Sequence, residues 1–313
     1  MTAKETALAI KEKMKLTVSG KDDIIDKMLI CLFCSGNILL EDIPGTGKTT
    51  MARALASAVD AGFSRIQFTA DLLPSDITGI KFFNQKENEF VFRKGGLFAN
   101  IVLADEINRA APRTQSALLE CMEEHQVTAD GETYPLPEPF MVIATENPIE
   151  TRGTFPLPEA QLDRFLMRLT PGYPDRESEL EMMLRRRSAY APESTGAAVS
   201  AEDILAARKE VLSVTVSSDC ADYILRLAEA SRSSGDIVMG ISPRGCIAVM
   251  RAAQGKAALS GRNFITPDDV KYVFSDVCAH RIISKDPFGK MSGEKLCEAI
   301  LNGTAVPREG LSR

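Results

Sequence analysis

The sequence predicts an α/β protein in which a parallel five-stranded sheet is followed by a smaller, all-helical domain. Three observations predict this fold. Five short apolar runs are separated mostly by helical patterns, a glycine-rich loop joins the first run to an alanine-rich helix, and the chain after residue 174 carries helical patterns only. Several runs are apolar throughout, which is typical of parallel strands covered by helices on both faces. A length of 313 residues suffices for two domains.

The five predicted strands lie in the first part of the chain. They are residues 38–40, 65–69, 101–104, 141–145 and 165–169. This spacing fits strand–helix–strand units with right-handed crossovers. The sequence Pro-Gly-Tyr-Pro at residues 171–174 then ends the pattern.

The rest of the chain is predicted to be helical. The expected helices are residues 175–190, 201–212, 218–231, 242–260 and 267–283, with a polar linker at 191–200. Asp175 is the expected N-cap of the first helix, and Thr-Pro-Asp-Asp at residues 266–269 is a strong helix start. We therefore expect a core at residues 1–172, a helical domain at 173–303 and a loosely ordered tail at 304–313.

Composition narrows the possible functions. The net charge of -6 argues against general binding to duplex DNA. Seven scattered cysteines, an odd number, indicate reduced thiols and a cytoplasmic protein. Cys31 and Cys34 have a spacing that can bind metal or do redox chemistry, but without a second pair core packing is the better interpretation. The longest charge-free apolar stretch, residues 28–40, is too short to span a bilayer.

A phosphate-binding loop follows the first predicted strand. Residues 42–50 read Asp-Ile-Pro-Gly-Thr-Gly-Lys-Thr-Thr, although the first glycine of the strict pattern is replaced by Asp42. Glycines between a strand and a helix turn several backbone N–H groups into one hollow. Lys48 would reach the β- and γ-phosphates, and the Thr49 hydroxyl would ligate Mg²⁺. The alternative is a glycine turn followed by a solvated lysine. The predicted nucleotide-binding residues of the loop are Pro44, Gly45, Thr46, Gly47, Lys48, Thr49 and Thr50.

Two carboxylates end the third predicted strand. Parallel sheets present ligand residues at the carboxyl ends of their strands, so Asp105 should lie beside the phosphate loop. There it would share the Mg²⁺ shell with Thr49, largely through water. Glu106 would be the general base that activates the attacking water. The alternative is a strand that merely ends in exposed acids.

Three further residues are candidates for the reaction. Asn147 follows the fourth predicted strand, where a neutral amide can bind both the γ-phosphate and the water, unless it only forms an Asn-Pro turn. Arg164 suits a role at the nucleotide of a neighbouring subunit, and its alternative is a local ion pair with Asp163 or Glu159. Arg244 begins a predicted helix of the second domain and would reach the γ-phosphate from above, unless it is simply solvated.

These motifs, in this order, resemble the MoxR family of AAA+ ATPases. The similar segments run from Leu-Leu-Glu-Asp-Ile-Pro-Gly-Thr-Gly-Lys-Thr at residues 39–49 to Gly-Thr-Phe-Pro-Leu-Pro-Glu-Ala-Gln-Leu-Asp-Arg-Phe at 153–165. Between them lie Ala-Asp-Glu-Ile-Asn-Arg-Ala at 104–110 and Ala-Thr-Glu-Asn-Pro at 144–148. The resemblance covers most of residues 18–283.

The resemblance implies an AAA+ core with a helical lid, assembled into a hexameric ring with Mg²⁺ and ATP between subunits. Arg164 then matches the arginine finger, Asn147 sensor 1 and Arg244 sensor 2. Val18 and Gly20 fall where the family contacts adenine. Two residues depart from the family pattern: lysine replaces glutamine at residue 21, and glutamic acid replaces glutamine at residue 146.

Two insertions are also implied, a helix-2 insert at residues 81–96 and a hairpin before sensor 1 at 126–136. Both would face the pore or one surface of the ring, where substrates are engaged, unless their apolar residues only pack the hairpins together. Arg109 would act across the subunit interface or form a structural ion pair.

The predicted function is Mg-dependent ATP hydrolysis that drives chaperone-like remodelling or maturation of protein complexes. The resemblance implies protein clients, often reached through a partner with a von Willebrand A domain, and no nucleic acid. The alternatives are a nucleic-acid motor, a chelatase-type motor subunit and a nucleotide-gated scaffold with slow hydrolysis.

Overall fold

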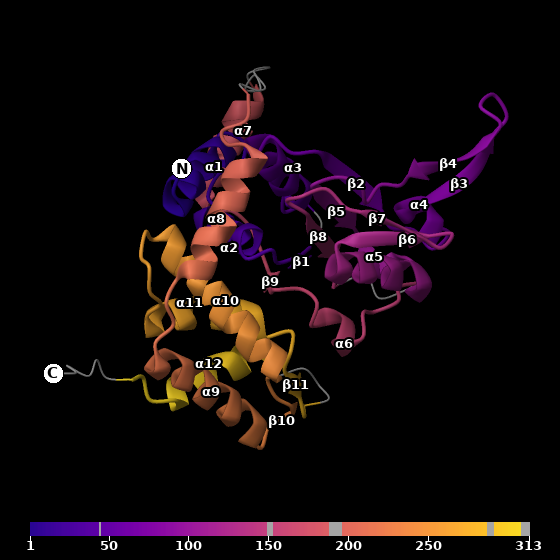
Figure 1. Cartoon of the computed structure of the whole chain (residues 1–313). Helices are drawn as coiled ribbons and strands as arrows, with labels where there is room; N and C mark the ends of the chain where they lie inside the picture. Colours follow the sequence, from indigo (N-terminus) through magenta and orange to yellow (C-terminus); the bar gives the residue numbers. More distant parts are fainter. Residues whose placement is uncertain (44, 149–152, 188–195, 287–290, 308–313) are drawn as a thin grey trace.

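A computed structural model describes the chain except residues 44, 149–152, 188–195, 287–290 and 308–313. The predicted fold class is confirmed: a parallel five-stranded sheet lies in the core, and a helical lid follows it (Figure 1). The sheet order is β2-β5-β8-β1-β9. Its strands are β1 (Ile38–Glu41), β2 (Phe63–Gln67), β5 (Ile101–Asp105), β8 (Met141–Glu146) and β9 (Met167–Leu169).

Two strands begin at residues other than those predicted, whereas β1, β5 and β8 begin as predicted and each end one residue later. β2 begins at Phe63 and ends at Gln67, two residues earlier than expected, because its register on β5 pairs Gln67 with the last residue of that strand, Asp105. β9 begins only at Met167, because the backbone N–H of Phe165 closes a turn on Leu162. The Phe165 ring is buried in the core instead.

The sheet is covered on both faces. One face packs on the helices that precede and follow the phosphate loop, α1 (Ala3–Lys15), α2 (Asp22–Phe33) and α3 (Lys48–Ala58), and its apolar core continues into the lid. The other face packs on α5 (Pro112–Glu124). Alternating residues explain this division, because Ile38 and Leu40 belong to the first core and Leu39 to the second.

The two N-terminal helices were not predicted. Thr2 and Glu5 form a capping box at the start of α1, and its buried residues recur at helical spacing. These residues are Ala3, Thr6, Ala7, Ile10 and Met14. Because α1 contacts the lid helix α8 as well as α2 and α3, the two parts of the chain share one hydrophobic core, and the division at residue 172 stays a prediction.

The lid contains α7 (Arg176–Arg187), α8 (Ala201–Ser213), α9 (Ser218–Ser233), α10 (Pro243–Leu259), α11 (Pro267–Cys278) and α12 (Gly293–Gly303). It also contains a short antiparallel pair that the sequence analysis did not expect, β10 (Ile237–Met239) and β11 (Ile283–Ser284). Strands of three and two residues are too short to show an alternating pattern. Because residue 283 belongs to β11, the last predicted helix does not extend that far, and it ends at Cys278.

Both insertions fold as hairpins. β3 (Gly79–Asn84) pairs with β4 (Glu89–Lys94) after the short helix α4 (Pro74–Thr78), and β6 (Gln126–Ala129) pairs with β7 (Glu132–Pro135). The rest of the core comprises a 3-10 turn, η1 (Ile107–Arg109), and the short helix α6 (Glu159–Leu162). Within the described part of the chain, no helix has the length and apolar character needed to cross a membrane.

Candidate functional site

The phosphate loop joins the carboxyl end of β1 to α3. Gly45 and Gly47 have φ angles of 91° and 89°, left-handed values that favour glycine. A Cβ at either position would meet no atom within 4 Å, so both glycines border open space and not packed protein. The first N–H groups of α3 have no intrahelical partner, which makes this loop suited to an anion. Pro44 lies outside the described residues.

Lys48 lies between two strand ends. Its Nζ donates to the carbonyl oxygens of Asp42 at 2.6 Å and Glu146 at 3.1 Å. Burial lowers the pKa of Lys48, and the carboxylates of Asp42 and Asp105 oppose that shift. The ammonium is therefore held where the ends of β1 and β8 meet. Thr49 is half-buried and Thr50 is exposed, while Thr46 is buried and donates to Ile43 O at 3.2 Å.

Asp105 and Glu106 are connected through a residue that the sequence analysis did not identify. The buried Thr145 hydroxyl donates to Asp105 Oδ1 at 2.7 Å and accepts from the backbone N–H of Glu106 at 2.8 Å. Glu106 has a left-handed φ of 57°, so its side chain leaves the strand in a different direction from that of Asp105. The two acids are thus held by one hydroxyl, and the interpretation as merely exposed acids does not fit them.

Two more side chains at the end of β2 bind these acids. Arg65 donates to Asp105 Oδ2 from Nε at 3.1 Å and from Nη2 at 2.6 Å. Gln67 Nε2 donates to Glu106 Oε2 at 2.9 Å. Both residues lie on the same face of β2, and the signal that could have found them is their spacing of two positions at the end of a strand. Arg109 forms a local ion pair with Glu106 at 3.1 Å.

The carboxyl end of β8 carries Glu146 and Asn147. Asn147 is buried and follows the central strand between β5 and β1, as predicted for a residue near the phosphate loop. Burial raises the pKa of Glu146 to about 7; the neighbouring Glu41 raises it further, and Arg168 acts in the opposite direction. The register pairs Glu146 with Glu41, which explains why these two carboxylates interact.

The predicted adenine-contacting segment lies beside the connection between core and lid. Val18 is buried, and Gly20 has a φ of 69°. A Cβ at Gly20 would lie 2.3 Å from Ser178 Oγ, so the segment packs closely on α7. Lys21 donates to the carbonyl oxygens of Pro171 at 2.7 Å and Gly172 at 3.0 Å. The lysine that replaces the family's glutamine therefore holds the start of the lid.

The two predicted arginines lie together, away from the phosphate loop of their own chain. Arg164 precedes the amino end of β9, whereas the phosphate loop follows the carboxyl end of the neighbouring parallel strand β1. Arg164 pairs with Glu123 of α5, not with Asp163 or Glu159 as its alternative suggested. Arg244 pairs with the same carboxylate. In this arrangement Arg244 binds a side chain of α5, and its role at the γ-phosphate stays a prediction.

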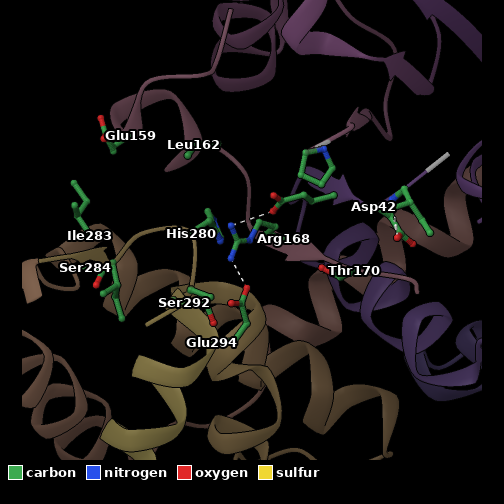
Figure 2. A pocket seen from close by; sticks show the side chains of 16 residues that line it. Asp42, Glu159, Leu162, Arg168, Thr170, His280, Ile283, Ser284, Ser292 and Glu294 are labelled. Atoms are coloured by element: carbon green, nitrogen blue, oxygen red, sulfur yellow. Dashed lines mark hydrogen bonds and ion pairs between the residues drawn. The ribbon is translucent and has the colours of Figure 1, made fainter. Parts of the chain in front are cut away.

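A cavity of about 950 Å³ lies between the core and the lid. Figure 2 shows Arg168 at its centre, bridging Glu41 of β1 and Glu294 of α12. Asp42 also lines it, but the glycines of the phosphate loop do not. The cavity therefore adjoins the predicted nucleotide site without coinciding with it.

The two hairpins form one exposed surface. Lys81 of β3 pairs with Glu132 of β7 at 2.5 Å, and the rings of Phe92 and Tyr134 stack with centroids 4.0 Å apart. These contacts hold the hairpins together. Other aromatic rings do not serve that purpose, since the exposed fractions of Phe82, Phe83 and Phe90 are 44%, 47% and 70%.

The donors near the loop fit Mg²⁺, a hard cation that prefers oxygen ligands. The Thr49 hydroxyl and the carboxylates of Asp105 and Glu106 supply such oxygens. Among the described residues no group of three His, Cys, Asp or Glu is placed to hold a metal by itself. Cys31 and Cys34 do not contribute, because Cys31 is buried in α2 and Cys34 donates to Arg251 O at 3.1 Å.

Both parts of the chain match known families and proteins. Residues 37–167 match the family described as "ATPase family associated with various cellular activities (AAA)", and residues 229–300 match the AAA lid domain. The chain is 38% identical to Chaperone MoxR1 of Mycobacterium tuberculosis, covering 95% of this chain and 81% of that protein. It is 32% identical to Protein MoxR of Paracoccus denitrificans, with 85% of both chains covered.

Two further relatives match nearly the whole chain. YeaC of Bacillus subtilis, described as uncharacterized, is 44% identical and covers 95% of this chain and 93% of its own. A crystal structure of a protein from Cytophaga hutchinsonii superposes with a TM-score of 0.88 at 39% identity, covering 98% of each chain. Core and lid therefore have relatives of the same architecture along their full length.

Proposed function

We propose that this chain, which belongs to the MoxR family of AAA+ ATPases, hydrolyses Mg·ATP and uses the reaction to remodel or mature other protein complexes. One observation carries the catalytic half of the proposal: Lys48, Asp105 and Glu106 lie at the carboxyl ends of β1 and β5, on either side of β8. The second half is supported by a relative that is named a chaperone.

The phosphates of ATP would bind to the backbone N–H groups of the loop and to Lys48. Lys48 contributes a point charge that is partly desolvated, so its attraction for a phosphate is stronger than in water. Thr49 and Asp105 would hold the metal, which neutralises charge on the β- and γ-phosphate oxygens. Asp105 is already bonded to Arg65 and Thr145, which favours contact with the metal through water.

Glu106 would accept the proton of the attacking water. Gln67 and Arg109 both approach Glu106 Oε2, and together they hold the carboxylate in one orientation. A base that is held in place does not lose orientational freedom in the transition state. Asn147, at the end of the adjacent strand, would orient the same water towards the γ-phosphate.

The working unit would be a ring, with the six subunits that the family resemblance implies. Arg164 supports an assembly, because it lies at the opposite end of the sheet from its own phosphate loop and has 31% of its side chain exposed. A guanidinium supplied by a neighbour can stabilise the charge that develops on the transferred phosphoryl group.

Protein clients, and a partner with a von Willebrand A domain, would bind at the hairpin surface formed by β3, β4, β6 and β7. Its exposed rings include Phe83 and Phe90, whose centroids lie 5.3 Å apart at an angle of 62°. Exposed apolar side chains of this kind often mark surfaces that bind proteins. The net charge of -6 and the relatives' names do not favour nucleic acid as the substrate.

The proposal is tested by comparing the wild-type protein with Glu106→Gln. The variant should bind ATP with the wild-type dissociation constant but release phosphate at least about 100-fold more slowly, because the base is lost. Glu124→Gln, an exposed acid of α5, is the matched control and should behave as wild type. Phosphate release by Glu106→Gln at the wild-type rate would show that Glu106 is not the base.

A further inference from the structure

Glu123 contacts one arginine of the core and one of the lid. Arg164 Nη2 lies 3.1 Å from Glu123 Oε2, and Arg244 Nη1 lies 3.1 Å from Glu123 Oε1. The two guanidiniums thus bind different oxygens of the same carboxylate. Arg244 Nε also lies 3.6 Å from Asp163, which is fixed by the buried Arg281 at 2.6 Å. The lid arginine is therefore held from two sides.

Both arginines remain accessible to a second molecule. Their side chains are 31% and 52% exposed, compared with 4% for Arg281. The cluster has three guanidiniums, those of Arg164, Arg244 and Arg281, and two carboxylates, those of Glu123 and Asp163, so one positive charge is left over. A planar guanidinium is well suited to phosphate oxygens, and two of them side by side can bind different oxygens of one phosphate.

We propose that Glu123 is a positioning residue, which holds Arg164 and Arg244 side by side so that both reach the γ-phosphate bound to an adjacent subunit. The inference rests on the proposed function and deepens it. It places the lid arginine in trans, together with the core arginine. The orientation of the lid in one subunit would then determine hydrolysis in the next.

The physical reason is that two like charges do not stay together unaided. Arg164 and Arg244 come from segments 80 positions apart and share the carboxylate of Glu123, while Asp163 is a second and more distant partner of Arg244. Without Glu123, repulsion and side-chain entropy would separate the two arginines, and the exposed Arg244 would move most freely. Removing the Glu123 carboxylate would also make the surface more positive. If the surface acted only by attracting phosphate, its removal would speed hydrolysis. If Glu123 positions the two arginines, its removal slows hydrolysis.

The first test compares Glu123→Ala with Glu124→Ala, its exposed neighbour on α5. We expect Glu123→Ala to lower kcat by about 10- to 100-fold, with the ATP dissociation constant within about twofold of wild type, because its own phosphate loop is intact. Glu124→Ala should keep the wild-type kcat. A kcat for Glu123→Ala equal to or above wild type would overturn the proposal.

The second test mixes subunits and does not depend on the absolute activity of one variant. Lys48→Ala inactivates its own loop but still offers both arginines to a neighbour, whereas Glu123→Ala has an intact loop. In equal mixtures about a quarter of the interfaces combine an intact loop with intact positioning, so activity should return to about a quarter of the wild-type rate. A mixture no more active than the sum of its separate components would overturn the positioning role in trans.

A third measurement tests whether Glu123 acts through Arg164 and Arg244. In the Arg164→Ala, Arg244→Ala double variant, adding Glu123→Ala should change kcat by less than about twofold, because the groups to be positioned are gone. A further tenfold loss would overturn the proposal. Failure of the proposed function is recognised separately: the wild type would then release no phosphate, or Lys48→Ala would release it at the wild-type rate.

Discussion

Asp42 Oδ2 accepts a hydrogen bond of 2.7 Å from the backbone N–H of Gly172, across 130 positions of the sequence. The other oxygen, Oδ1, accepts from the N–H of Ile43 at 2.7 Å. Asp42 stands where the strict phosphate-loop pattern has its first glycine, and its carboxylate connects the loop to the start of the lid. The departure from the pattern thus has a structural role.

Asp42→Asn should destabilise the fold. The asparagine amide has only one carbonyl oxygen, and its NH₂ group would face one of the two N–H donors, leaving a buried donor unpaired. We expect the free energy of unfolding in urea to fall by about 1–3 kcal/mol. Asp60→Asn, at an exposed position, is the matched control and should change it by less than about 0.5 kcal/mol. Equal values for both variants would contradict this role.

Lys48→Ala should abolish ATP binding, because the Nζ that would bind the phosphates is lost while the loop glycines remain. The measurement is the dissociation constant of a fluorescent ATP analogue, which should rise at least about 100-fold, corresponding to a lost charge-assisted contact of about 3 kcal/mol. Lys209→Ala, an exposed lysine of α8, should bind as wild type does. Unchanged binding by Lys48→Ala would place the nucleotide elsewhere.

Thr145→Val removes the hydroxyl shared by Asp105 and the Glu106 N–H without changing the shape of the side chain. Because Thr145 is fully buried, we expect a loss of about 1–3 kcal/mol in unfolding free energy, together with a marked fall in kcat. Thr145→Ser keeps the hydroxyl and should retain most of the activity. The prediction is wrong if the serine and valine variants have the same kcat.

Glu146 should make stability depend on pH. Its pKa is raised from 4.5 to about 7, so the native state keeps a proton that the unfolded chain releases within this window. The free energy of unfolding therefore falls as pH rises from 4.5 to 7, and the loss is complete above pH 7. Glu146→Gln removes this dependence.

Urea unfolding of wild type and Glu146→Gln at pH 5.5 and pH 8 tests the sign of this pH dependence. The free energy of unfolding of Glu146→Gln, minus that of wild type, should be about 2 kcal/mol larger at pH 8 than at pH 5.5. The estimate uses about 1.4 kcal/mol per pH unit between pH 5.5 and the raised pKa. Glu298→Gln, at an exposed position of α12, should show no such increase. A constant difference between wild type and Glu146→Gln would mean that Glu146 titrates normally.

Much of the site was predictable because its chemistry is local in sequence. The glycines, Lys48 and Thr49 follow one strand directly, and Asp105 and Glu106 end another. Parallel strands present their carboxyl ends at one edge, so the motifs themselves indicate which residues meet. The five strands and the helical lid follow from apolar patterning and turn signals, whereas the two hairpins were implied by the family resemblance.

The partners of these residues could not be predicted, because they come from strands and helices distant in the chain. Thr145, Arg65 and Gln67 reach the acids only through the sheet order β2-β5-β8. The ion pairs of Arg164 and Arg244 with Glu123 likewise depend on how the lid is placed against the core, and no local pattern encodes that placement. Sequence alone determined the residues that would touch a phosphate, since backbone geometry and side-chain chemistry act within a few positions. Tertiary structure decided which charges are paired, because ion pairs form between whichever surfaces the hydrophobic cores bring into contact.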